Sequence, residues 1–89
     1  MKFEPSNFGV IVCGCVLKNE KPVLYVYHDE KDWQFLCGDD HDSTDGASVV
    51  GVGHLTKRDP SLNQLADLPN GWEAERKTTK SDWVRSNAE

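Results

Sequence analysis

The sequence predicts a small α+β fold in which a mostly antiparallel sheet is joined by one or two short helices. Three observations lead to this prediction. With 89 residues, the chain is long enough for one hydrophobic core and too short for two. Short runs rich in valine, leucine and aromatic residues alternate with loops that contain glycine, proline, asparagine or aspartate. The strongest helix signal, Asp59 followed by Pro60, comes after the middle of the chain.

A three-stranded antiparallel meander is predicted for the N-terminal part of the chain, after a polar lead-in at residues 1–7. Residues 9–17 are apolar at successive positions, which is typical of a strand buried on both faces. A charged loop follows, and residues 23–28 are rich in valine and tyrosine, as strands are. Residues 33–37 form the third predicted strand, after a second charged turn.

The C-terminal part of the chain contributes the helix and the remaining strands. In chain order we predict a loop at 38–46, a strand at 49–52, a helical turn beginning at 53–55, a helix from 59 that ends at 69–71, and strands at 72–77 and 83–85. Aspartate as N-cap and proline at the first helical position favour the helix start. Residues 1–89 are therefore expected to form a single domain, with 86–89 as a frayed tail.

Negative charge is concentrated in one segment. The chain has 15 acidic and 10 basic side chains and a net charge of -5. Seven of the acids lie between Asp29 and Asp45, with Lys31 as the one base among them. Such a chain is a poor nucleic-acid binder, because phosphate contacts need clustered lysine and arginine. It has no apolar run long enough to span a membrane. We therefore predict that it binds neither nucleic acid nor a membrane, and that its partner is a basic protein.

The cysteine pattern predicts a reducing cytoplasm. Three cysteines are an odd number, and Cys13 and Cys15 lie two apart on a predicted strand, where a disulfide would be strained. The segment before Cys15 is similar to the end of a lipoprotein signal, but its apolar stretch is too short. A basic C-terminal end and an acidic middle are compatible with self-association, so we expect a monomer or a weak homodimer.

The acidic segment is the main candidate for a functional site, and its acids have several interpretations. A dense negative loop attracts and orients a basic protein partner, or it is only a solvated turn. A calcium loop is disfavoured, because the glycine falls one place late and no bidentate glutamate follows. A metal-binding protein or metal-dependent enzyme that uses His41, His54 and the loop acids remains an alternative. The candidate partner-binding acids are Asp39, Asp40, Asp42 and Asp45.

Catalysis has little support in the sequence. Cys37 with His41 or His54 offers a nucleophile and a base, but no oxyanion hole is recognisable. We therefore predict no enzymatic activity, no cofactor and no resident metal. Trp33 and Trp72 are the candidate aromatic anchors for a partner, because tryptophan is enriched among the residues that dominate interfaces. Core packing is the competing explanation for Trp33.

Three segments resemble a bacterial family called domain of unknown function 2185. They are residues 33–40 (WQFLCGDD), 59–62 (DPSL) with Leu65, and 68–76 (LPNGWEAER). The resemblance covers roughly the last two thirds of the chain and includes Asp39 and Asp40. The family is also described as a predicted immunity-protein group of polymorphic toxin systems.

The resemblance implies a small α+β protein that neutralises a toxin by direct binding. Together with the acidic loop, it predicts a non-enzymatic bacterial protein that binds a basic toxin or another basic protein. An adaptor with a different partner is an alternative that the sequence does not separate from an immunity protein.

Overall fold

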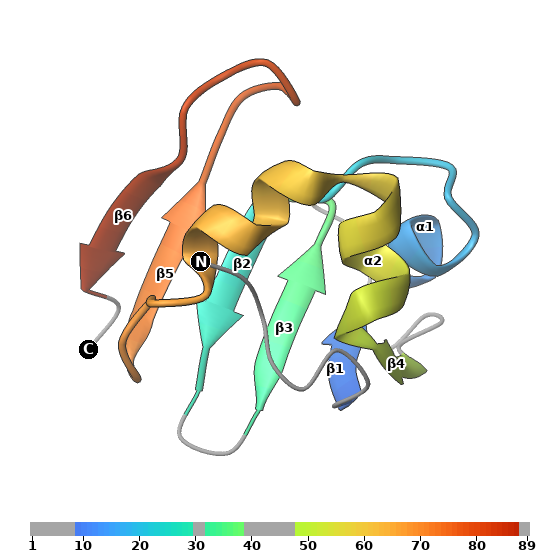
Figure 1. Ribbon diagram of the computed structural model, residues 1–89, viewed down its shortest axis with the longest axis horizontal. Helices are drawn as coiled ribbons and strands as arrows, with labels where there is room; N and C mark the ends of the chain where they lie inside the picture. The colour runs from blue at the N-terminus through green and yellow to red at the C-terminus, as the bar shows by residue number, and fades with distance from the viewer. Residues whose placement is uncertain (1–8, 30–31, 39–47, 88–89) are drawn as a thin grey trace.

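The computed structural model describes residues 9–29, 32–38 and 48–87. The described part of the chain forms one open six-stranded sheet with short helices, so the predicted α+β class is confirmed (Figure 1). The strands are β1 (Gly9–Val12), β2 (Tyr25–His28), β3 (Trp33–Leu36), β4 (Ser48–Gly51), β5 (Trp72–Glu75) and β6 (Val84–Asn87). The helices are α1 (Gly14–Leu17), α2 (Val52–Arg58) and the 3-10 helix η1 (Pro60–Leu65).

The strand order across the sheet is β4-β1-β3-β2-β5-β6, and all neighbours except β1 and β3 are antiparallel. The β2–β3 hairpin agrees with the predicted meander, but the place of the first strand was wrong. Strand β3 lies between β1 and β2 and pairs with β1 in parallel. The reason is that α1 and the loop after it carry the chain from β1 past the position of β3, which a tight hairpin does not do.

The predicted strand at 9–17 was too long, because it ends at Val12 and the next apolar residues form α1. A short apolar run fits a buried strand and a buried helix equally well, so the pattern did not separate them. The helix ends at Leu17 with Lys18 as its C-cap, and the next residue, Asn19, has a left-handed φ of 59°. The amide of Asn19 donates to the carbonyl of Val16, and that of Glu20 to the carbonyl of Cys15. These two bonds make a Schellman motif with asparagine in place of glycine.

The predicted helix start at Asp59 is confirmed. Its carboxylate accepts a hydrogen bond from the amide of Ser61, at 3.1 Å, and Pro60 occupies the first helical position. The helix is of the tighter 3-10 type and is shorter than expected, because the chain turns again at residues 66–71. Figure 1 shows α2 and η1 one after the other in front of the sheet.

Side chains from the helix-covered face of the sheet and from the helices make the core. Four strand residues on this face, from four neighbouring strands, are fully buried: Val12, Phe35, Val26 and Ala74. Leu62, Leu65 and Leu68 cover them from the η1 side and are 2% exposed or less. The alternation of side chains along each strand leaves the intervening residues on the opposite face.

The C-terminal strand is longer than predicted. Ser86 and Asn87, which the sequence places in a frayed tail, pair with Glu73 and Trp72 at the edge of the sheet. All four residues of β6 are exposed, so their own sequence carries little hydrophobic signal for a strand. No helix in the described ranges is long and apolar enough to cross a membrane.

Candidate functional site

Trp33 and Trp72 lie on the helix-covered face of the sheet, on either side of His28. His28 is the register partner of Trp33 in β3 and of Trp72 in β5. The rings of His28 and Trp33 stack at 3.8 Å between centroids, and Nδ1 of His28 donates to the carbonyl of Leu68, at 2.6 Å. Both tryptophans are half-buried and pack against the core. The structure thus brings the two predicted anchors into one row, while their role toward a partner stays a prediction.

The acids of the predicted loop, Asp39, Asp40, Asp42 and Asp45, lie outside the described residues, as does His41. Of the two histidines in the metal hypothesis, His54 lies within the described residues. It is exposed on α2, and its Nε2 accepts a hydrogen bond from Arg58, at 2.8 Å. In the described ranges no three histidine, cysteine or acidic side chains come together as metal ligands.

The face of the sheet away from α2 and η1 carries a different set of side chains. Over β2 and β5 no helix of the described chain covers it, as Figure 1 shows. Tyr25 and Tyr27 project from β2, opposite Glu75 and Glu73 of β5 in the register. We call this surface, formed by Tyr25, Tyr27, Glu73 and Glu75, the open face. Its residues are half-buried or exposed, in contrast to the buried residues between them.

A hydrogen bond organises the open face. The hydroxyl group of Tyr25 donates to a carboxylate oxygen of Glu73, diagonally across the β2–β5 pair. Burial raises the pKa of the Tyr25 hydroxyl above its ordinary value, and the bond to Glu73 and the negative charges of Glu73 and Glu75 raise it further. Tyr25 therefore stays protonated at physiological pH and holds the Glu73 carboxylate in one place.

The open face contains acidic groups and no basic ones at its strand positions. Alternation along the six strands assigns twelve positions to the whole of this side of the sheet, and the charged residues among them are Glu73 and Glu75. Aromatic rings beside carboxylates form a surface that suits a partner with exposed lysine or arginine, through ion pairs and cation–π contacts.

A buried arginine is the most prominent polar group that sequence reasoning missed. The Arg76 side chain is 1% exposed and follows β5 on the helix-covered side of the sheet. Its Nη2 contacts Oδ2 of Asp59 at 2.5 Å, and Nη1 donates to Oγ of Ser61 at 2.8 Å. Nε and Nη2 also donate to the carbonyl of Val23. These bonds satisfy the buried charge and tie β5 to the start of η1 and to the segment before β2.

The ion pair sets the ionisation of Asp59. Partial burial alone would raise its pKa, but hydrogen bonds from Ser61 and Arg76 and the positive charge of Arg76 outweigh burial and lower the pKa below its usual value. The guanidinium of Arg76 also contacts Trp83, with its central carbon 4.2 Å from the centroid of the Trp83 ring. Asp59, Arg76 and Trp83 therefore form one cluster that joins η1 to the β5–β6 loop and has a structural role.

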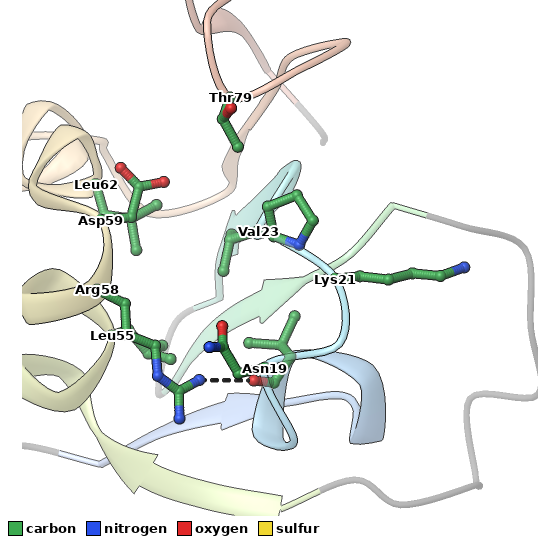
Figure 2. A pocket seen from close by; sticks show the side chains of 10 residues that line it. Asn19, Lys21, Val23, Leu55, Arg58, Asp59, Leu62 and Thr79 are labelled. Carbon is green, nitrogen blue, oxygen red and sulfur yellow. Dashed lines mark hydrogen bonds between the residues drawn. The ribbon is translucent and has the colours of Figure 1, made fainter.

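A cavity of about 320 Å³ lies next to this cluster. Figure 2 shows that it opens between the end of α2, the loop after α1 and the β5–β6 loop. Asp59 lies on its wall, while Arg58 and Asn19 face each other at its lower end (Figure 2). The size is at the small end of the range for ligand pockets in proteins.

No family model, curated protein or solved structure matches the chain. The resemblance to domain of unknown function 2185 therefore stays a prediction.

The burial of Arg76 could have been predicted from the sequence, whereas the open face could not. Trp72, Ala74 and Arg76 alternate, so the two-residue period of a strand already places Arg76 on the same side as two apolar residues. The open face has no such signal, because the meeting of β2 with β5 joins residues 48 apart in the sequence.

Proposed function

We propose that this protein is a non-enzymatic, cytoplasmic binding protein that captures a basic protein partner. It acts in the manner of an immunity protein, which neutralises its toxin by direct binding. The observation that carries the proposal is the open face, on which two tyrosines lie beside two glutamates with no basic residue at the strand positions. A basic partner gains ion pairs there without opposing repulsion.

Two further features support a binding role. The open face belongs to the central part of the sheet, whose backbone is held by neighbouring strands on both sides, so its side chains are presented on a rigid element. The predicted loop acids Asp39, Asp40, Asp42 and Asp45 add negative charge to the same chain and increase the rate of encounter with a basic protein. The resemblance to predicted immunity proteins points to the same kind of action.

Affinity capture from the source organism's lysate, at low and at high salt, tests the proposal. The bait proteins are the wild type and a variant with both Glu73→Gln and Glu75→Gln, which removes charge and keeps side-chain size. We expect a basic protein in 1:1 ratio that is lost at high salt and is captured less by the variant. When purified, the partner's own activity should fall upon complex formation.

Two outcomes would contradict this function. One is a partner that is acidic or that stays bound at high salt with equal yield on both baits. The other is stoichiometric metal in protein purified without a chelator, together with metal-dependent turnover, which favours the metal-dependent alternative. A third bait with the four loop aspartates replaced by asparagine separates the contribution of the loop from that of the open face.

A further inference from the structure

The cavity beside α2 has a polar end and an apolar wall. Its apolar lining includes Pro22, which is exposed, and Val23, which is 5% exposed; Leu55 and Leu62 also line it but are 2% and 0% exposed. The polar groups come from Asn19, Arg58 and Asp59, with Thr79 of the β5–β6 loop on the far rim (Figure 2). An apolar wall with a few convergent polar groups is the usual composition of a small-molecule site.

Arg58 supplies the charge at the polar end, and its guanidinium is held in place. Nη1 donates to the carbonyl of Val16 at 3.0 Å, and Nη2 donates to Nε2 of His54 at 2.8 Å. A guanidinium has five N–H groups, and these two bonds use two of them. The rest stay available to a planar anion, and a fixed orientation lowers the entropy cost of binding one.

Asn19 places an amide beside this guanidinium. Figure 2 shows the Asn19 side chain directed toward Arg58, whereas the Lys21 side chain extends away from it. The left-handed backbone of Asn19, with φ of 59°, fixes where its side chain starts. An amide N–H next to a guanidinium completes a donor set for the two oxygens of a carboxylate.

Asp59 does not cancel this positive end. Its carboxylate accepts hydrogen bonds from Ser61 and from the buried Arg76, so its charge is already balanced by an ion pair inside the protein. The cavity therefore keeps the positive charge of Arg58, although the chain as a whole is acidic.

From this geometry we propose that the cavity binds a small organic monocarboxylate with a short apolar tail. Arg58 and Asn19 hold the carboxylate, and Pro22 and Val23 contact the tail. The cavity of about 320 Å³ limits the ligand to a small molecule. This site is separate from the open face, and the proposal does not depend on the proposed function.

Titration of the ¹⁵N-labelled protein, followed by amide chemical shifts, tests the ligand class. The probe is hexanoate, with 1-hexanol as the neutral control of the same tail and inorganic phosphate as an anion without a tail. We expect saturable shifts at Asn19, Leu55 and Arg58 with hexanoate, and affinity weaker by about tenfold or more for 1-hexanol and for phosphate.

Equal affinity for 1-hexanol and hexanoate would contradict a carboxylate site, because tail burial alone would then explain binding. Tighter binding of phosphate, shifts confined to other parts of the molecule, or no saturable binding of hexanoate would overturn the proposal as well. These comparisons use the wild-type protein, so they do not depend on the folding of any variant.

Three variants assign the roles of the residues. Arg58→Gln should weaken hexanoate binding by about tenfold or more, because a charged donor is lost. Lys57→Gln makes the same charge change one position away, at an exposed lysine that does not line the cavity, and should change affinity by no more than about twofold. Equal losses in these two variants would mean a general charge effect and no site.

Asn19→Gly is the third variant, and it removes the amide while keeping the left-handed backbone, which glycine adopts without strain. We expect affinity to fall by several-fold to about tenfold with an unchanged unfolding temperature. Unchanged affinity would remove Asn19 from the site. The Asn19→Gly variant also tests the site if Arg58→Gln fails to fold after loss of the hydrogen bond to the Val16 carbonyl.

Discussion

The two faces of the central strands differ in what they do for the molecule. On the helix-covered face, the neighbouring side chains Phe35, Val26 and Ala74 are fully buried under α2 and η1. The residues next to them in each strand, Gln34, Tyr27 and Glu73, lie on the opposite side of the sheet, which includes the open face, and keep contact with solvent. One set of strands thus supplies apolar side chains to the core and polar side chains to the solvent, because adjacent positions point to opposite faces.

Removal of a large core side chain should have the largest effect. Phe35→Ala deletes a ring that is 0% exposed, and we expect it to lower the free energy of unfolding by about 4 kcal/mol. Gln34→Ala changes the neighbouring residue on the opposite face and should cost less than about 1 kcal/mol. Urea unfolding followed by tryptophan fluorescence measures both. Similar losses in the two variants would contradict the assignment of the faces.

Loss of Asp59 should have the next largest effect. Asp59→Ala leaves the buried guanidinium of Arg76 without its anion, which should cost about 3 kcal/mol of unfolding free energy. Asp67→Ala breaks the Arg85–Asp67 pair at the surface, whose side chains are 35% and 50% exposed, and should cost less than about 1 kcal/mol. The same urea experiment compares the two ion pairs, and an equal cost would mean that the Asp59 pair is not effectively buried.

The contribution of the Asp59–Arg76 ion pair to stability should depend on pH. Because the pKa of Asp59 is lowered in the folded protein, its charged form stabilises the fold above the ordinary carboxyl pKa of 3.8. This contribution is lost as the pH falls through the lower folded value. The stability difference between the wild type and Asp59→Asn should thus stay constant at neutral pH and shrink in acid. A difference that does not depend on pH down to strongly acidic conditions would contradict this linkage.

On the open face, Tyr25→Phe should lower stability less than the changes at Phe35 and Asp59 do. It removes the hydroxyl group that bonds to Glu73 and keeps the ring, so we expect a loss of about 0.5–1 kcal/mol. The same change should reduce affinity for a basic partner, because the Glu73 carboxylate loses its fixed orientation. Thermal unfolding and binding to the captured partner, measured on the same samples, test both halves of the prediction.

The sequence predicted well those elements whose signals are local. The aspartate–proline pair at 59–60 marks a helix start through its own backbone chemistry, and the β2–β3 hairpin follows from two strand-like runs separated by a short turn. The parallel pairing of β1 with β3 was missed, because it depends on where α1 directs the chain. For the same reason the sequence selected loop acids and tryptophans as site residues and did not find Glu73 and Glu75.

Affinity of the purified partner for the Glu73→Gln, Glu75→Gln variant, measured at low salt, tests the central claim most directly. We expect binding weaker by about tenfold or more, with the free energy of unfolding within about 0.5 kcal/mol of the wild type. Unchanged affinity in a folded variant would contradict the claim that the open face is the surface that binds the partner.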